Sequence, residues 1–227
     1  MTEANNQNSP ETRLRSIHDA MAKASKLARR KADATTLIAV SKTRSADEIT
    51  PLLIAGHRHF GENRVAEAAE KWPALRAAYP DVTLHLIGQL QSNKANDAVA
   101  LFDIIHALDR PSLAKALGKA MRDATRNVPC FIQVNIGNEA QKGGCPIADL
   151  PQLLALANEE GITILGLMCL PPADVEPAPY FALLAELAAK NGLHGLSMGM
   201  SDDYEIAVPL GATYIRVGTA LFGQRKA

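Results

Sequence analysis

The sequence predicts a single (β/α)8 barrel, and two observations carry this prediction. Eight short apolar runs alternate with stretches of helical periodicity along the 227 residues, which is the pattern of parallel βα units. No break in composition marks a second domain, and eight such units in one chain favour a closed barrel over an open sheet.

The barrel is expected to fill residues 11–227, after a polar, disordered tail over residues 1–10. An extra helix from about Arg13 to Lys31 precedes the first strand, because apolar residues recur there every three or four positions. The eight strands are expected at 36–41, 58–60, 83–87, 102–106, 130–134, 162–167, 194–197 and 213–216. The helices between them are expected at 46–55, 63–71, 92–100, 112–123, 147–159, 178–190 and 202–209.

Two segments are less regular than the others. The second strand, at 58–60, is a weak one because Gly56-His57-Arg58-His59 is not apolar, and without this strand a doubly wound open sheet is the alternative. The stretch PPADVEPAP, residues 171–179, contains too many prolines for a helix and is expected to form one long loop after the sixth strand.

The composition argues against several classes of function, although a local basic patch stays possible. Lysine plus arginine equals aspartate plus glutamate, 24 against 24, so no global field favours nucleic acid or an anionic membrane. The sequence has no signal-peptide h-region and no run of about 18 apolar residues. Its three cysteines lack the close spacing of a zinc or CxxC redox site, and Cys130 is expected to be a core residue. We therefore expect a soluble, cytoplasmic protein.

Lys42 directly follows the apolar run of the first strand, and two interpretations are open. Most lysines at strand ends are solvated charges. Strand alternation, however, places Ile38, Val40 and Lys42 on one face, so the amine shares its direction with apolar residues. An amine held against apolar walls loses its proton more easily and attacks carbonyls, which makes a Schiff base possible.

Ser201, Gly218 and Thr219 follow the seventh and eighth strands, in SMGMSDD and RVGT. Ser201 is a good helix N-cap residue, and the amides at a helix start bind anions. In barrels, the loops after strands seven and eight frequently bind phosphate. Ordinary helix capping and a phosphate cradle are both compatible with these residues.

Arg216 lies within the eighth strand, where alternation pairs it with Tyr214 and opposes it to Ile215 and Val217. A charged group on the inner face needs a partner, which would be a carboxylate or a ring nitrogen of a cofactor. An arginine that faces a pyridine nitrogen keeps this nitrogen unprotonated and makes the cofactor a weak electron sink.

Three further residues give weaker signals. Asn63 either binds a cofactor oxygen or caps the helix that follows it, and His85 is either a site residue or a core histidine. Lys142 in NEAQKGG is expected on a mobile loop that offers a second anion contact. His57 and His59 are too poorly partnered to indicate a metal site.

Six segments in order carry a family resemblance: IAVSKTRSADEI, HRHFGENRVAEAAEK, LHLIGQLQSNKA, VNIGNEAQKGG, GLMCLPP and LSMGMSDDYEIAVPLGATYIRVGTALFG. Together they resemble the pyridoxal phosphate homeostasis protein family, also called alanine racemase N-terminal-domain-like, over about residues 36–223.

The resemblance implies a racemase-type barrel that holds pyridoxal 5'-phosphate (PLP) as a Schiff base. It implies that Lys42 is the Schiff-base lysine and that Arg216 is the partner of the pyridine nitrogen. The residues expected to bind PLP further comprise Asn63, His85, Met168, Ser197, Met200, Ser201, Gly218 and Thr219, with Ser201, Gly218 and Thr219 as the phosphate cradle. No catalytic residue and no metal ligand is assigned.

Three functions remain open. The first is intracellular PLP homeostasis, in which a monomer or weak dimer buffers PLP and delivers it to PLP-dependent apoenzymes without robust catalysis. The second is a PLP-dependent racemase, and the third is a class I aldolase-like barrel that uses its lysine without a cofactor. The chain ends at Ala227 directly after the last barrel unit, and none of its four tyrosines is placed as the second acid/base of a racemase. The first function is therefore favoured.

Overall fold

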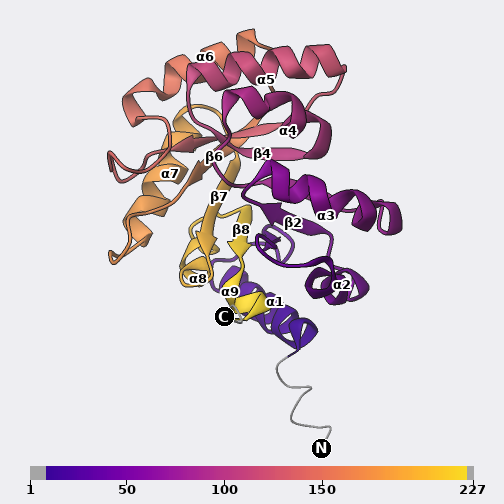
Figure 1. The fold of residues 1–227 in the computed structure, drawn as a ribbon. Helices are drawn as coiled ribbons and strands as arrows, with labels where there is room; N and C mark the ends of the chain where they lie inside the picture. Colours follow the sequence, from indigo (N-terminus) through magenta and orange to yellow (C-terminus); the bar gives the residue numbers. More distant parts are fainter. Residues whose placement is uncertain (1–8, 224–227) are drawn as a thin grey trace, which may run out of the picture.

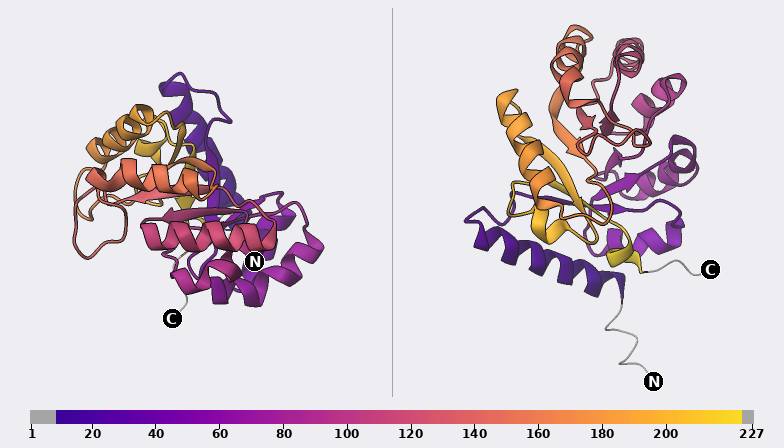
Figure 2. Two further views of the ribbon diagram at one scale, coloured as in Figure 1. Left: turned by 90° about the horizontal axis from the view of Figure 1, so that it is seen from above. Right: turned by 90° about the vertical axis from the view of Figure 1, so that its left-hand side faces the viewer.

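The computed structural model describes residues 9–223 and contains a closed barrel of eight parallel strands (Figure 1, Figure 2). The strands follow one another around the barrel in chain order, and β1 closes it by pairing with β8. This confirms the predicted (β/α)8 fold and excludes the doubly wound sheet. The strands are β1 Thr36–Val40, β2 His59–Glu62, β3 Thr83–Leu86, β4 Ile104–Leu108, β5 Cys130–Val134, β6 Ile164–Cys169, β7 Gly195–Met200 and β8 Tyr214–Val217.

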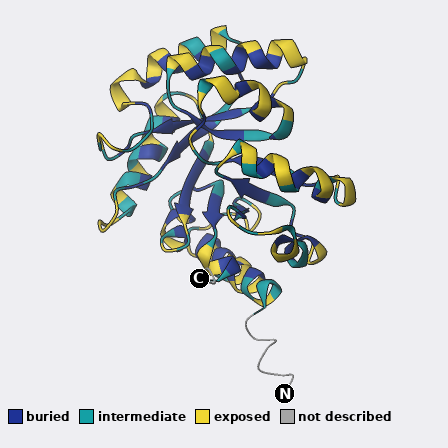
Figure 3. Ribbon diagram, in the orientation of Figure 1, coloured by how far each residue is buried: buried dark blue, intermediate teal, exposed yellow. Residues whose placement is uncertain are grey.

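Helices surround the strands, with buried faces turned to the barrel and exposed faces turned outward (Figure 3). The extra helix α1 packs against α2, α8 and α9, and Figure 2 shows it beside α9 at the end of the described chain. The helices are α1 Pro10–Leu27, α2 Ala46–Ile54, α3 Val65–Ala78, η1 Ser92–Lys94, α4 Ala95–Leu101, α5 Pro111–Ala124, η2 Ile147–Asp149, α6 Leu150–Glu159, α7 Ala178–Lys190, α8 Tyr204–Ala207 and α9 Thr219–Phe222.

The first helix differs from its predicted span of residues 13–31. It begins at Pro10, because the side chain of Ser9 accepts a hydrogen bond from the Thr12 amide and proline is favoured in the first turn of a helix. It ends at Leu27. Residues 1–8 of the expected tail lie outside the described residues, and Pro10 is already helical.

Several other boundaries were predicted too early or too late. Strands β4 and β6 begin two residues after their predicted starts. The prediction began too early because Phe102 and Ile162 are apolar and buried, although they precede the hydrogen-bonded part of each strand. Helix α3 continues through Pro73 well beyond residue 71, whereas α8 covers only part of 202–209. The proline-rich loop ends at Pro177, because Pro179 fits the first turn of α7.

The inside of the barrel is only partly apolar, and this determines where the site lies. Outward-facing strand residues and the helices form the main hydrophobic cluster. Ile38, Phe131 and Met168 are fully buried but stand apart from that cluster, inside the ring of strands. Buried polar side chains accompany them, and these are His85, His106, Ser197 and Arg216.

All three cysteines are free and buried, which confirms the interpretation of Cys130 as a core residue. Burial raises the pKa of the Cys130 thiol to about 12. Within residues 9–223, no helix is both long and apolar enough to cross a membrane. In the same part of the chain, no three His, Cys, Asp or Glu side chains gather closely enough to hold a metal ion.

Candidate functional site

A pocket of about 300 Å³ lies where β1, β2, β7 and β8 end, and we call it the mouth pocket. Seven of the predicted cofactor-binding residues line it: Lys42, Asn63, Met200, Ser201, Arg216, Gly218 and Thr219. The remaining wall consists of Val40, Ile87, Leu170 and Asp202. Polar groups that lie far apart in the sequence therefore converge at the carboxyl end of the barrel, where barrel enzymes have their active sites.

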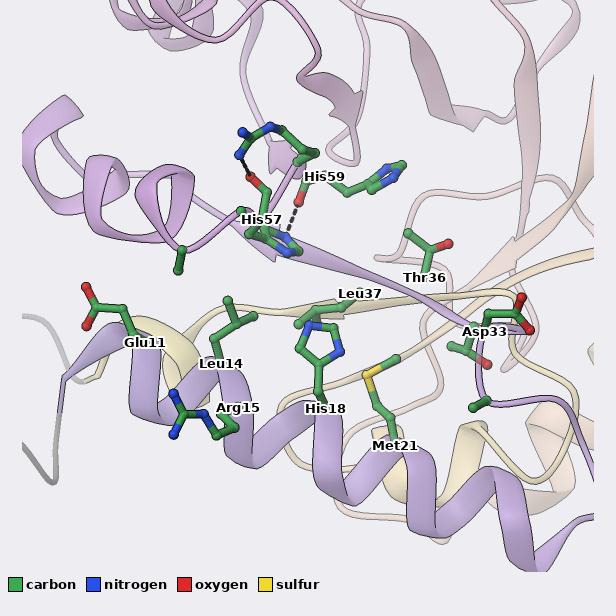
Figure 4. Close-up of a pocket in the computed structure, with 15 residues that line it drawn as sticks. Glu11, Leu14, Arg15, His18, Met21, Asp33, Thr36, Leu37, His57 and His59 are labelled. Atoms are coloured by element: carbon green, nitrogen blue, oxygen red, sulfur yellow. Dashed lines mark hydrogen bonds between the residues drawn. The ribbon is translucent and has the colours of Figure 1, made fainter.

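A larger cavity of about 610 Å³ lies elsewhere, between α1 and the amino ends of β1 and β2 (Figure 4). We call it the amino-end cavity. Its wall includes His18, His57 and His59 but none of the predicted cofactor-binding residues. Size alone would favour this cavity as the ligand-binding site, whereas the chemistry of the lining side chains favours the mouth pocket as that site.

Lys42 is half-buried and lines the mouth pocket together with Val40, while Ile38 is fully buried on the strand behind them. This agrees with the face predicted from strand alternation. The Lys42 amine makes no hydrogen bond or ion pair with any residue between 9 and 223. It is therefore a nitrogen that is available to a ligand, placed on an apolar wall.

A buried carboxylate holds the chain directly before Lys42. The Ser41 hydroxyl donates to Glu62 Oε1 over 2.6 Å, and Trp72 Nε1 donates to the same oxygen over 3.0 Å. Lys71 Nζ lies 2.9 Å from Glu62 Oε1 and donates to the Ser41 carbonyl over 2.8 Å. Sequence reasoning missed this network, although a glutamate at the end of a buried strand signals that partners must exist.

Arg216 is almost fully buried and reaches the mouth pocket from β8. Its Nη1 donates to Ser197 Oγ over 2.7 Å and its Nη2 donates to the Cys169 carbonyl over 2.8 Å. No ion pair joins it to a carboxylate of the described chain, so both partners are uncharged. Burial lowers the pKa of the guanidinium. Arginine has five N–H donors, so donors remain for a ligand in the pocket.

Ser201 and Gly218 lie against each other on the rim of the mouth pocket, with Thr219 beside them. The Gly218 amide donates to Ser201 Oγ over 3.3 Å. Of the two alternatives for Ser201, ordinary helix capping is excluded, because α8 begins only at Tyr204 and Asp203 occupies the cap position. Ser201 instead joins the loop after β7 to the loop after β8, as an element of the rim.

Three predicted residues do not line the mouth pocket. His85, Met168 and Ser197 are fully buried inside the barrel. Ile87 and Leu170, two positions further along the chain and directly after the ends of β3 and β6, occupy the pocket wall instead. The burial of His85 agrees with the core-histidine alternative, and Met168, which only the family resemblance assigned to the cofactor, likewise lies below the pocket wall. Ser197 contacts the pocket only through Arg216.

The structure excludes helix capping for Asn63 and places Lys142, expected as a second anion contact, away from the mouth pocket. Asn63 lines the mouth pocket and does not cap α3, which begins at Val65 without a side-chain cap. Lys142 lies outside the wall of the mouth pocket. Its Nζ donates to the Pro171 carbonyl over 3.0 Å and pairs with Glu139 at 2.7 Å, so it joins the loops after β5 and β6.

The groups of the mouth pocket suit a ligand with three features. A free amine condenses with an aldehyde or ketone, and Lys42 supplies it. The buried guanidinium of Arg216 donates to an acceptor atom or an anion. The hydroxyls of Ser201 and Thr219 on the rim suit phosphate oxygens. The side chains present therefore fit an aldehyde or ketone that carries a phosphate and a further hydrogen-bond acceptor.

Known proteins are similar to this chain in sequence and in fold. The family model of the alanine racemase N-terminal domain matches residues 17–226. A pyridoxal phosphate homeostasis protein of Pseudomonas aeruginosa is 40% identical over 197 residues, which cover 83% of this chain and 84% of that protein. PipY of Synechococcus elongatus, solved with PLP bound, is 40% identical, with a TM-score of 0.76 and coverage of 89% of this chain and 100% of that chain. An alanine racemase of Clostridium difficile is similar in fold alone, with 14% identity, a TM-score of 0.69 and coverage of 92% and 57%.

Proposed function

From its membership of the alanine racemase N-terminal domain family, and of the pyridoxal phosphate homeostasis proteins within it, we start a proposal. We propose that the chain binds PLP as a Schiff base on Lys42. Its role is PLP homeostasis, in which it holds the cofactor and releases it to PLP-dependent apoenzymes. PLP supplies an aldehyde that condenses with an amine to a Schiff base with visible absorbance.

One observation carries this proposal: the unpartnered amine of Lys42 shares the mouth pocket with the buried guanidinium of Arg216 and the hydroxyl rim. The rim residues Ser201 and Thr219 would hold the phosphate, and Gly218 lies against Val40 of β1. Arg216 would donate to the pyridine nitrogen, which then stays unprotonated and withdraws electrons weakly. A weak electron sink suits a protein that holds its cofactor more than one that labilises bonds to it.

The wall of the mouth pocket also favours holding over racemisation. A racemase needs a second acid/base opposite the lysine. In the part of the chain that the structure describes, no tyrosine, histidine or cysteine lines the mouth pocket, and its one carboxylate, Asp202, is exposed to solvent. Tyr214 lies deeper in the barrel, where its ring contacts His85, His106 and Phe131.

The visible spectrum of the purified protein tests the proposal. Addition of PLP should produce a Schiff-base band, and borohydride should reduce it and fix the cofactor to Lys42. Lys42→Ala should abolish the band while the fold remains, because the amine makes no hydrogen bond or ion pair with residues 9–223 that the substitution would remove. Lys94→Ala, which changes an exposed lysine paired with Asp97, is the matched control and should keep the band. A wild-type protein that stays colourless after addition of PLP would contradict the proposal.

A racemase-type enzyme is the second candidate, because the matching family model describes a domain of alanine racemase. Exchange of α-protons for deuterium on a panel of amino acids distinguishes the two functions. We expect no turnover, and sustained exchange at rates ordinary for enzymes would establish the racemase instead.

Loss of PLP from the loaded protein to a PLP-dependent apoenzyme would support delivery, and size-exclusion chromatography would test the expected monomer or weak dimer.

A further inference from the structure

A chain of hydrogen-bonded side chains crosses the inside of the barrel from β2 to β8. His59 Nδ1 lies 3.1 Å from His85 Nε2, and His85 Nδ1 lies 3.0 Å from His106 Nε2. His106 Nδ1 lies 2.9 Å from Ser197 Oγ, which accepts from Arg216 Nη1 over 2.7 Å. One end, His59, lines the amino-end cavity, and the other end, Arg216, lines the mouth pocket.

Aromatic packing holds the rings of this chain in place. His106 stacks on Phe131 with ring centroids 4.6 Å apart and an angle of 15° between the planes. The Tyr214 ring contacts His106 at 5.6 Å and His85 at 5.5 Å. His85 and His106 are fully buried, so neither ring can turn without disturbing its neighbours. Figure 4 shows the ring of His59 pointing away from α1.

The donors and acceptors of the chain determine its direction. Arginine can only donate, so Ser197 Oγ must accept from Arg216. If His106 also donated to Ser197, the buried hydroxyl proton of Ser197 would have no acceptor, which is unfavourable. Ser197 therefore donates to His106 Nδ1.

The same reasoning extends to the other histidines. Burial holds the pKa of His85 and of His106 well below the ordinary value and lowers the pKa of His59, so all three rings are neutral. A neutral His106 that accepts at Nδ1 carries its proton on Nε2 and donates to His85 Nδ1. His85 then donates from Nε2 to His59 Nδ1.

We propose that His59, His85 and His106 are positioning residues for Arg216, each with its proton on Nε2, because this order holds the Ser197 hydroxyl where it accepts from the guanidinium. The proposal rests on the proposed function for the role of Arg216 towards PLP. Without an acceptor at His106, the Ser197 hydroxyl turns to another partner and its hydrogen bond with Arg216 weakens. Loss of one such hydrogen bond corresponds to about fivefold weaker PLP binding, or about 1 kcal/mol.

The tautomers can be observed in the apoprotein by NMR of ¹⁵N-labelled histidine. We expect the Nε2–H form for all three histidines in the wild type and a mixture of tautomers for His106 in Ser197→Ala. His194→Gln, which changes an exposed histidine outside the hydrogen-bonded chain, assigns the His194 signal and should leave this pattern intact. A wild-type His106 that carries its proton on Nδ1 would overturn the proposal.

Two substitutions of His106 test the effect on Arg216. His106→Leu removes the acceptor, whereas His106→Asn keeps an oxygen near the place of Nδ1. In the apoprotein, exchange of the Arg216 guanidinium protons should accelerate in His106→Leu and stay slow in His106→Asn. With PLP, His106→Leu should bind about fivefold more weakly and absorb at a shifted wavelength, and His106→Asn should restore both.

Unchanged exchange in a folded His106→Leu contradicts the proposal. If His106→Leu does not fold, the exchange in Ser197→Ala and the wild-type tautomers decide instead. A wild type that never binds PLP refutes the proposed function, while the apoprotein measurements still test the histidine chain.

Discussion

Replacement of Glu62 by glutamine should lower the free energy of unfolding by about 3 kcal/mol, because the ammonium group of Lys71 loses its buried carboxylate partner. The side chain of Glu62 is fully buried, and its Oε1 receives Ser41 Oγ, Trp72 Nε1 and Lys71 Nζ within 3.0 Å. Glutamine keeps an oxygen for two of these donors but leaves the Lys71 ammonium without its buried counter-charge.

The magnitude follows from the partners that Lys71 retains. Breaking a buried ion pair costs about 3–5 kcal/mol. Lys71 still pairs with Glu67 at 2.9 Å and donates to the carbonyls of Ser41 and Arg44, so the lower end of this range applies. For a chain of this size, about 3 kcal/mol corresponds to a decrease of Tm of roughly 6–12 °C.

Urea and thermal unfolding of the apoprotein would measure this effect, with Glu67→Gln as the matched control. Glu67 pairs with the same lysine but is partly exposed, so its loss should cost about 1 kcal/mol or less. Burial raises the pKa of Glu62, while the donors around it lower this pKa. If Glu62 already carried a proton at neutral pH, Glu62→Gln would cost no more than the control. That result would refute the reasoning.

Two further predictions concern the strand ends and the dependence on pH. Gly88→Ala should destabilise the protein by about 3 kcal/mol and weaken PLP binding, because a Cβ would stand 2.3 Å from the carbonyl oxygen of Asn63, in the pocket wall. Urea unfolding would measure the loss of stability, and a PLP titration would measure the loss of affinity. A loss of stability under about 1 kcal/mol would contradict this prediction, because it would mean that the strand ends separate freely. Burial lowers the pKa of His57 from 6.5 to about 4, so between pH 7 and pH 4 the unfolded chain takes up a proton that the folded protein does not. The free energy of unfolding should therefore fall by about 3 kcal/mol over this window through His57 alone, and His57→Gln should flatten the slope relative to His194→Gln. An identical slope in both variants would contradict this assignment.

Some parts of the fold and site could be predicted because they depend on local patterns. Strand β5 and helix α7 lie where the apolar periodicity indicates, and alternation orients Arg216 inward. Lys42 was recognised because a lysine that shares a face with Val40 is chemically unusual. These features follow from the side-chain periods of strands and helices, which a short stretch of sequence reveals.

Other parts depended on distances across the barrel. The family resemblance assigned His85 and Met168 to the cofactor site, whereas the stagger of the strands around the barrel places Ile87 and Leu170 in the pocket wall. Ser201 resembled a helix cap, but its partner is Gly218, which belongs to the next strand's loop.

The sequence by itself determined the order of the βα units and the direction of each strand residue, because both depend on neighbours along the chain. Only the closed barrel decided which inward side chains meet. His106 and Ser197 are 91 residues apart in the sequence, and they form a hydrogen bond because β4 and β7, three strands apart around the barrel, both turn these side chains into the interior. The register of the strands around the closed barrel sets such contacts, and no local pattern encodes it.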